Sequence, residues 1–251
     1  MMLELVLLRH GESTWNAKNL FTGWTDVDLS EKGRDEAAAA GMVMGDSHIE
    51  PMIVHTSVLT RSVKTANIAL DAMDRCWIPV RRHWRLNERH YGDLQGKNKQ
   101  ESTGVYGEEQ VKVWRRSYST PPPPVALDDP RHPVNDPRYH HVPASALPPT
   151  ECLADVVSRI LPYFYDTIVA DLYRYRSVLV VAHGNSLRAL VKHLEGISDR
   201  EIEELDIPTG VPRRYVLEDS LEIKEAGYLG DPEKIKEAAR AVAAQATGKT
   251  G

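Results

Sequence analysis

The chain has 251 residues, enough for one large α/β domain or two small ones, and either can bury a core. Hydrophobic residues make up 41% of the sequence and charged residues 27%, which excludes global disorder. A formal net charge of −5 argues against a nucleic-acid-binding protein, and no apolar run reaches the ~18 residues of a membrane span. Two cysteines, Cys76 and Cys152, are too few for a disulfide framework and predict a reduced, cytoplasmic location.

Strand-like and helix-like segments alternate along the first third of the chain. The near-continuous apolar run at 3–8 predicts a central strand. Ser30 is the predicted N-cap of a helix that carries residues 37–40. A short strand is expected at 52–55 and a helix at 60–73. This alternation is typical of a mainly parallel sheet covered by helices.

The alternation returns in the second half of the chain. Apolar residues between 150 and 168 recur at helical spacings and predict a helix, which Pro162 should kink. A buried strand is expected at 178–181, followed by a helix at 186–195. Asp and Pro at 231–232 have the residue types of a helix start and predict one more helix.

These elements predict a single α/β domain over residues 1–251, with three α/β/α layers around a mainly parallel central sheet. The segment 118–149 is too rich in proline for a regular element. It could be a disordered linker between domains. We favour a long ordered excursion over the surface, because the flanking segments read as one interrupted domain.

A histidine follows each of two predicted buried strands. Arg9-His10-Gly11 ends the first strand, and His183-Gly184 ends a later one. Ligands of open α/β sheets bind outside the carboxyl ends of the strands, so the two histidines could converge on one site. Either histidine alone could simply occupy a strand end, and the repeated pattern is what favours a functional site.

The chemistry of such a pair is either phosphoryl transfer or metal binding. One imidazole can attack phosphorus while the other, as an imidazolium, neutralises oxyanion charge. Neither His10 nor His183 has a partner at the spacing of a metal motif, and Arg9 disfavours a divalent cation. We therefore rank anion chemistry above a metal site.

Eight stretches of the chain then carry a family resemblance. The set resembles the 2,3-bisphosphoglycerate-dependent phosphoglycerate mutases of the histidine phosphatase superfamily and covers nearly the whole chain. The triplet RHG would indicate only the superfamily, whereas LNERHYG is more specific to the mutase branch. Asp93 and the proline run at 121–124 look like local variation. The stretches are RHGESTWN (9–16), FTGW (21–24), DVDLSEKG (26–33), TSVLTR (56–61), LNERHYG (86–92), WRR (114–116), AHGNSLR (182–188) and IPTGVP (207–212).

The resemblance implies a role for each central residue. His10 matches the nucleophile that becomes phosphorylated. Arg9, Arg61 and His183 would clamp the transferring phosphoryl group, since Arg and His⁺ spread oxyanion charge. Glu88 matches the general acid/base, although a surface Glu–Arg pair would be the ordinary interpretation outside this motif.

The resemblance also implies a substrate-binding set. Arg115 and Arg116 would help to bind the carboxylate and the non-reacting phosphate, and two adjacent helical residues reach one ligand only near the end of the helix. The full expected set is Arg9, His10, Gly11, Glu12, Ser13, Thr14, Trp15, Asn16, Thr22, Gly23, Arg61, Glu88, Arg89, His90, Tyr91, Lys99, Arg115, Arg116, Gly184 and Asn185.

The implied activity is isomerisation of 3-phosphoglycerate to 2-phosphoglycerate, in glycolysis and gluconeogenesis. It would proceed through phosphohistidine and 2,3-bisphosphoglycerate, with the bisphosphate as primer and no metal. A phosphatase of the same superfamily is the alternative enzyme, and a non-enzymatic phosphoester-binding protein is the alternative outside enzymes. Partners would be small phosphoglycerates, not nucleic acid or membrane.

Two further expectations concern assembly and the C-terminus. We expect a homo-oligomer, dimer or tetramer; an apolar cluster around Trp77 and Trp84 could form its interface or equally belong to the core. Residues 231–251 are expected to form a mobile tail with a weakly apolar helix, in which Lys249 could meet an anionic ligand, and the resemblance implies that this tail helps to close the active site. A tail without a role is the simpler alternative. The apolar positions of the helix are Ile235, Ala238, Ala239, Val242, Ala243 and Ala246.

Overall fold

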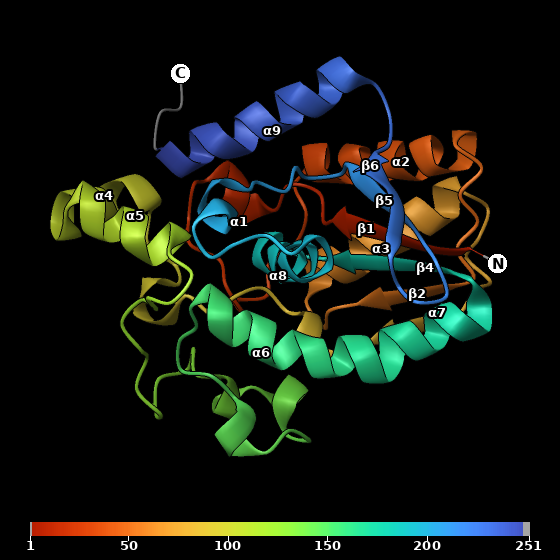
Figure 1. Ribbon diagram of the computed structural model, residues 1–251. Helices are drawn as coiled ribbons and strands as arrows, with labels where there is room; N and C mark the ends of the chain where they lie inside the picture. Colours follow the sequence, from red (N-terminus) through yellow and green to blue (C-terminus); the bar gives the residue numbers. More distant parts are fainter. Residues whose placement is uncertain (1, 248–251) are drawn as a thin grey trace.

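A central sheet of six strands organises the protein in this computed structural model, which describes residues 2–247 except for the side chains at 234, 241 and 243–247. The strand order is β3-β2-β4-β1-β5-β6 (Figure 1). The strands are β1 (Leu3–Arg9), β2 (Ile53–Thr56), β3 (Val80–Arg82), β4 (Ser177–Ala182), β5 (Pro212–Leu217) and β6 (Ile223–Tyr228).

The sheet is mixed but mostly parallel, as predicted. β1 pairs in parallel with β4, β4 with β2, and β2 with β3, whereas β5 and β6 are antiparallel. The hairpin of β5 and β6 was not predicted from the sequence. Its strands carry charged residues such as Arg213 and Glu225, which hide the apolar run that marks a buried strand.

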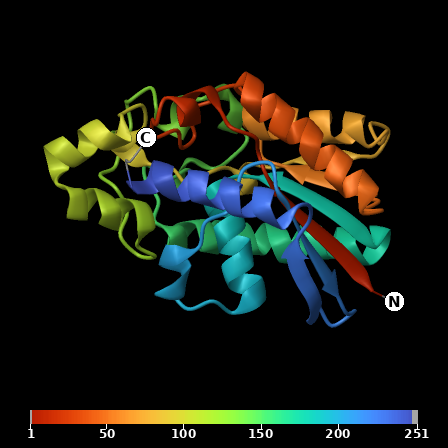
Figure 2. The ribbon, with the colours of Figure 1, turned by 90° about the horizontal axis from the view of Figure 1, so that it is seen from above.

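Helices cover both faces of the sheet and give the three predicted layers (Figures 1 and 2). Leu5 and Leu7 of β1 pack with α6, α7 and α8, while Val6 and Leu8 pack with α2 and α3 on the opposite face. The helices are α1 (Thr14–Ala17), α2 (Glu31–Asp46), α3 (Thr60–Ala72), α4 (Lys99–Tyr106), α5 (Glu108–Arg116), α6 (Leu153–Tyr163), α7 (Val169–Tyr175), α8 (Gly184–Glu195) and α9 (Pro232–Thr247).

The helix predicted after Thr150 continues further than expected. Pro162 lies near the end of α6, and the chain then passes through a π-helical turn at Phe164–Ile168 into α7. The wider turn keeps Phe164 and Ile168 on the buried side, in the same core as α6. Pro162 and the π-helical turn thus lie in succession at the junction of α6 and α7.

The proline-rich segment 118–149 packs against the rest of the protein. It contains three short 3₁₀ turns and buries Tyr139, whose ring centroid lies 4.9 Å from that of Trp24. Tyr139 also accepts a hydrogen bond from Asn87 at 2.8 Å. The segment thus contacts the motif stretches at 21–24 and 86–92, which both contribute residues to the candidate site. Its other buried apolar residues are Val125, Val142 and Leu147.

The backbone that follows β1 passes very close to the first turns of α2. A Cβ at Gly33 would lie 2.0 Å from the Glu12 carbonyl oxygen, whereas a Cβ at Gly45, on the same helix, would have nothing within 4 Å. We expect Gly33→Ala to lower the free energy of unfolding by ~1–3 kcal/mol through this overlap. The matched variant Gly45→Ala should raise it by ~0.5–1 kcal/mol.

Urea titration of both variants checks this prediction. Equal stability of Gly33→Ala and the wild type would show that the backbone after His10 yields easily, contrary to the packing described here.

Candidate active site

Two buried histidines meet at the carboxyl ends of adjacent parallel strands. The register of β1 on β4 sets Arg9 opposite Ala182, and the His10 backbone N–H donates to the Ala182 carbonyl at 3.0 Å. The ring centroids of His10 and His183 are consequently 4.8 Å apart. The two strand ends predicted from the sequence therefore converge on one place.

His10 has a defined tautomer. Its Nδ1 lies 2.7 Å from the Gly11 carbonyl oxygen, which can only accept, so Nδ1 carries the proton and Nε2 keeps its lone pair. Burial, and then the charges of Arg61 and Arg9, hold the pKa of His10 well below its usual value. His10 is therefore a neutral imidazole with a free nitrogen, the form that a nucleophile requires.

His183 is held from its other nitrogen. Its Nε2 lies 2.7 Å from Ser57 Oγ, and its Nδ1 is buried without a hydrogen-bond partner among the described residues. Burial is the largest cause of a pKa well below the usual value, followed by the charges of Arg61, His10 and Arg9. The imidazolium expected from the sequence is therefore absent before a ligand binds. A bound phosphoryl group would favour the charged form.

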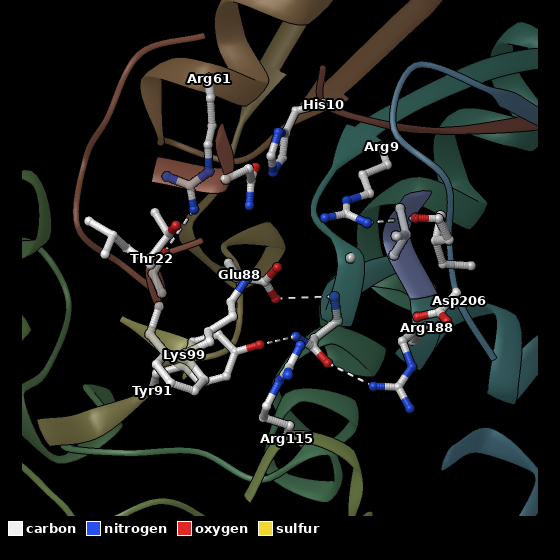
Figure 3. A pocket seen from close by; sticks show the side chains of 18 of the residues that line it. Arg9, His10, Thr22, Arg61, Glu88, Tyr91, Lys99, Arg115, Arg188 and Asp206 are labelled. Atoms are coloured by element: carbon white, nitrogen blue, oxygen red, sulfur yellow. Dashed lines mark hydrogen bonds between the residues drawn. The ribbon is translucent and has the colours of Figure 1, made fainter. Parts of the chain in front are cut away.

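Arg9 and Arg61 flank His10 on its two sides (Figure 3). The Arg9 Nη1 donates to the Ile207 carbonyl at 2.7 Å, and its buried Nε has no partner within the described part of the chain. Arg61 is 1% exposed and donates to the carbonyls of Gly23 and Thr25, at 2.8 and 3.1 Å. Burial lowers the pKa of Arg61 to about 10, which still leaves it charged near neutral pH.

Glu88 lies between the histidine pair and a second cluster of polar side chains. Its Oε1 accepts from the backbone N–H groups of Arg89 and Asn185, at 2.7 and 3.1 Å. Its Oε2 faces Gly184, where an added Cβ would lie 3.6 Å away. Two backbone donors thus orient the carboxyl group, and one oxygen remains directed toward the site.

The second cluster lies beyond Glu88. The Asn185 amide donates to the Tyr91 hydroxyl at 3.1 Å and accepts from Arg188 Nη1 at 2.9 Å. α5 ends at Arg116, so Arg115 and Arg116 both reach the cavity from a helix end. Figure 3 shows Tyr91 and Arg115 at the end of the cavity opposite His10.

The amine of Lys99 has a strongly lowered pKa. Burial, and then the charges of Arg115 and Arg9, lower the pKa of Lys99 to about 7. Glu88 acts in the opposite direction. A lysine so placed exchanges its proton near neutral pH, and the arrival of an anion would favour its charged form.

One cavity connects these groups, with a volume of about 760 Å³ including the solvent at its mouth. Most of the predicted residues line it. They are Arg9, His10, Asn16, Thr22, Gly23, Arg61, Glu88, Tyr91, Lys99, Arg115, Arg116, Gly184 and Asn185.

Other predicted residues do not line the cavity wall. Gly11 packs against the Gly33 backbone, and Ser13 caps α1. Arg89 lies over the Tyr91 ring at 4.5 Å and donates to the Arg115 carbonyl at 3.0 Å, so it supports the second cluster from outside. The remaining predicted residues off the wall are Glu12, Thr14, Trp15, His90 and His183.

Several cavity residues were not predicted from the sequence. Arg188 lies one helical turn after Gly184, and that spacing could have found it. Asp206 pairs with Arg116 at 2.9 Å, a contact across 90 positions that no local pattern signals. Val242, by contrast, is one of the apolar positions predicted for the C-terminal helix, and it reaches the cavity, while Lys249 lies outside the described residues. The others are Leu20, Phe21 and Ile207.

The fold and the paired histidines with their arginines are accompanied by a match to the histidine phosphatase superfamily, whose sequence model (branch 1) covers residues 5–129 and 126–219. A 2,3-bisphosphoglycerate-dependent phosphoglycerate mutase of Thermobifida fusca is 58% identical over 243 residues, 96% of this chain and 98% of its own. The mutase of that name from Nitratidesulfovibrio vulgaris (Hildenborough) is 56% identical over 244 residues, 97% and 98% of the two chains. The chain belongs to this family of phosphoglycerate mutases, as its motifs predicted.

Solved structures agree on the fold. A protein described as mycobacterial hydrolase 1 superposes with a TM-score of 0.68 at 23% identity, over 92% of this chain and 98% of its own. A mycobacterial glucosyl-3-phosphoglycerate phosphatase in complex with VO3 gives a TM-score of 0.68 at 24% identity, over 90% and 97% of the two chains. At this level of identity the likeness concerns architecture alone.

The pKa of Lys99 predicts proton uptake when an anion binds. The free amine is largely neutral above pH ~7, and a bound anion raises its pKa, so the protein should take up more protons than Lys99→Met, by about one near pH 8. Calorimetric titration with sulfate in two buffers of different ionisation enthalpy measures this number.

Lys224→Met is the matched control, because the pKa of Lys224 is raised and that amine stays charged throughout. Equal proton uptake by the wild type and Lys99→Met would contradict the assignment.

Proposed function

We propose that this protein interconverts 3-phosphoglycerate and 2-phosphoglycerate, as an isomerase of glycolysis and gluconeogenesis. One observation carries the proposal: His10, the clamping arginines Arg9 and Arg61, and a second cationic cluster share one cavity, with Glu88 between them. A substrate with a phosphate at one end and a carboxylate near the other matches two such poles. The names of the related mutases agree with this chemistry.

The residues fit 2,3-bisphosphoglycerate as the primer. Buried polar atoms without a partner among the described residues include Arg9 Nε, Thr22 Oγ1, His183 Nδ1 and Arg188 Nε. Unpaired buried donors are costly, and an anion with many acceptor oxygens would satisfy them. Arg9, Arg61 and His183 would hold one phosphate, and bound 2,3-bisphosphoglycerate supplies the phosphoryl group that primes the enzyme.

The chain's own residues then perform the transfer. His10 Nε2 forms a bond to phosphorus, while Glu88 gives a proton to the departing oxygen. In the next half, Glu88 takes the proton of the free substrate hydroxyl, which then accepts the phosphoryl group from His10. The second cluster binds the non-reacting end throughout, so that either oxygen of the substrate can be presented to His10.

A phosphatase of the same superfamily remains the second candidate. In that reaction water replaces the hydroxyl acceptor, and no binding of a carboxylate is needed. The cluster of Tyr91, Lys99, Arg115 and Arg116 favours the mutase, because hydrolysis alone gives it no purpose. No group of three or more His, Cys, Asp or Glu side chains suited to a metal ion occurs in residues 2–247.

We also propose a cytoplasmic homo-oligomer. β3 is an edge strand, and Trp77 just before it is 67% exposed, which supports an interface there, whereas Trp84 is buried in the core. Light scattering measures the mass of the assembly in solution.

Cys76 and Cys152 are both free thiols, which suits a reducing compartment. None of the helices in the described range is long and apolar enough to cross a membrane.

The mutase activity is tested with 3-phosphoglycerate, with and without added 2,3-bisphosphoglycerate. We expect 2-phosphoglycerate to form, faster with the bisphosphate, and an acid-labile, base-stable adduct to map to the His10 peptide. Activity should persist in EDTA and fall with vanadate. Release of inorganic phosphate without 2-phosphoglycerate would identify a phosphatase instead.

Glu88→Gln is the matched variant for this test, because it keeps the shape and both backbone contacts but cannot carry the proton. We expect kcat to fall by ~10²–10⁴-fold. A rate close to that of the wild type would assign the acid/base role to another group.

We further propose that the C-terminal segment closes the cavity, which the position of Val242 supports. Few large apolar side chains lie on α9, so its docking should be weak and reversible. Deleting residues 240–251 should therefore lower mutase activity more than hydrolysis of 2,3-bisphosphoglycerate, since an open site admits water. Unchanged rates for both reactions would leave the segment without a catalytic role.

A further inference from the structure

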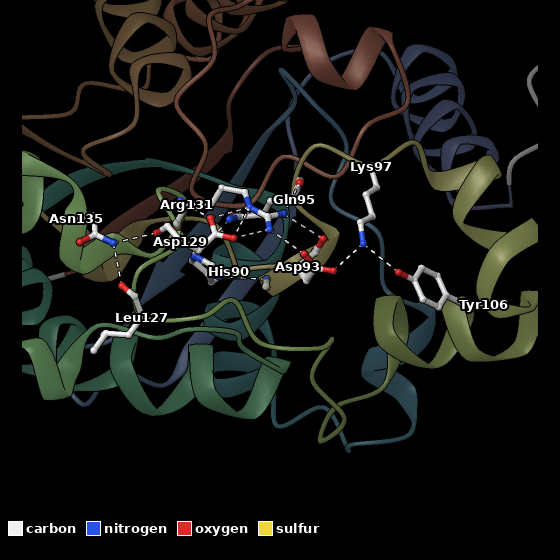
Figure 4. Close-up of polar contacts among 10 residues, drawn as sticks. His90, Asp93, Gln95, Lys97, Tyr106, Leu127, Asp129, Arg131 and Asn135 are labelled. Carbon is white, nitrogen blue, oxygen red and sulfur yellow. Dashed lines mark hydrogen bonds and ion pairs between the residues drawn. The ribbon is translucent and has the colours of Figure 1, made fainter.

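The proline-rich segment 118–149 is joined to the active site by a series of polar contacts, of which Figure 4 shows the part around Arg131 and Asp93. The series begins at Arg131, in the tight turn that Asn135 closes by donating to the carbonyls of Leu127 and Asp129 at 2.9 Å each. The Asp129 carboxylate accepts from the Arg131 backbone at 2.8 Å and from its Nη2 at 2.7 Å. These contacts within the turn fix the direction in which the Arg131 guanidinium points.

The Arg131 guanidinium binds the stretch that follows the mutase motif at 86–92. Arg131 Nη2 donates to Asp93 Oδ1 at 2.8 Å, and Nη1 donates to the backbone carbonyls of Asp93 and Gln95 at 3.3 Å each. The other Asp93 oxygen accepts from Lys97 at 2.7 Å, and Lys97 also reaches the Tyr106 hydroxyl of α4. Asp93, which looked like local variation in the sequence, joins the 118–149 segment to the segment that leads into α4.

His90 belongs to this support and not to the cavity wall. Its Nδ1 accepts from the Gly92 backbone at 3.1 Å, so its Nε2 carries the proton and faces the Arg131 carbonyl at 3.4 Å. Burial is the main reason that the pKa of His90 falls to about 3, and the ring is neutral at physiological pH. The ligand contact expected for His90 therefore gives way to a supporting role.

Gln95 transmits the position of this stretch to the cavity wall. Its Oε1 accepts from the Trp24 backbone N–H at 2.7 Å. Gly23 has a φ of +55°, and a Cβ there would lie 2.2 Å from the same oxygen, so the Gln95 side chain packs directly against the turn. The turn at residues 23–24 is thus shaped by a residue whose backbone carbonyl Arg131 binds.

The turn at residues 23–24 contacts both Arg61 of the phosphate clamp and Glu88, the proposed acid/base. The Gly23 carbonyl accepts from Arg61 at 2.8 Å, which orients the guanidinium toward the histidine pair. The Trp24 indole N–H donates to the Glu88 carbonyl at 2.5 Å. A shift of Gln95 would therefore displace the phosphate clamp and the acid/base together.

We propose that Arg131 and Asp93 are positioning residues for phosphoryl transfer, acting through Gln95 and the turn at residues 23–24 on Arg61 and Glu88. The ion pair itself is partly exposed, with side chains 34% and 39% accessible, so it contributes little to stability. Its effect is on geometry, where errors near 1 Å slow an enzyme by up to ~10²-fold. The proposal rests on the mutase activity proposed above.

The test compares Arg131→Met with Arg34→Met. Arg34 pairs with Asp28 at 3.0 Å, with side chains 44% and 39% exposed, so this pair is similar in exposure to the Arg131–Asp93 pair and lies outside the series of contacts described above. Arg131→Met should lower the melting temperature somewhat more than Arg34→Met, because Arg131 also binds Asp129 and the carbonyls of Asp93 and Gln95. Arg131→Met should lower kcat by about 10-fold per phosphorylatable His10, with KM for 3-phosphoglycerate within about two-fold, because the second cluster is intact. Arg34→Met should leave kcat unchanged.

A double variant separates positioning from general loosening. If Arg131 acts through Gln95, Arg131→Met combined with Gln95→Leu should be no slower than Gln95→Leu alone. Losses that multiply, or equal kcat for Arg131→Met and Arg34→Met, would overturn the proposal. Should Arg131→Met fail to fold, Asp93→Asn and Arg131→Lys serve in the same comparison, and Lys should restore only part of the rate.

A binding measurement distinguishes failure of this proposal from failure of the proposed function. Vanadate resembles the trigonal-bipyramidal transition state, whereas inorganic phosphate resembles the ground state. Arg131→Met should lose about 10-fold in vanadate affinity and keep its phosphate affinity. If the wild type lacks mutase activity but this difference is found, the proposed function fails and positioning stands. If the wild type is active and the difference is missing, positioning fails alone.

Discussion

The parallel pairing of β1 with β4 is the constraint on which the site depends. It sets Arg9 opposite Ala182, so the residues that follow, His10 and His183, leave the sheet side by side. A rigid pair of central strands keeps the rings 4.8 Å apart without any direct hydrogen bond between them. Both rings are buried, and burial keeps them neutral until an anion arrives. The same packing that forms the core thus holds His10 as a neutral imidazole with a free nitrogen.

This arrangement concentrates positive charge in a buried cavity, where burial disfavours it. Arg61 and Lys99 both have lowered pKa values, mainly because burial disfavours their charged forms. Only a few anionic side chains lie among the cavity-lining residues, and Asp206 is already paired with Arg116. The stabilisation that these cations lack in the free protein becomes available when a polyanionic ligand enters. The burial that disfavours these cations would therefore also favour the binding of a polyanion.

The peripheral segments give this cavity its shape. The 118–149 segment packs on Trp24 through Tyr139 and fixes the 93–95 stretch through Arg131, and both contacts converge on the turn that holds Arg61. α4 and α5 deliver Lys99 and the two adjacent arginines at their ends. A surface excursion and a helical hairpin therefore position groups that the central sheet alone would leave unplaced.

The sequence by itself determined the local features of this protein. Apolar runs and helical periodicity predicted strands β1, β2 and β4 and the helices that cover them, and the residues after β1 and β4 marked the site, because strand ends and motifs are read over a few neighbouring positions. Only the tertiary structure decided the tautomer of His10, the neutral state of His183, the pairing of Arg116 with Asp206 and the supporting role of His90. Each depends on burial or on a partner that lies on another element, and neither is encoded in the spacing of nearby residues. The β5–β6 hairpin was missed for a related reason: the partner strand β1, and not its own polar sequence, places it in the sheet.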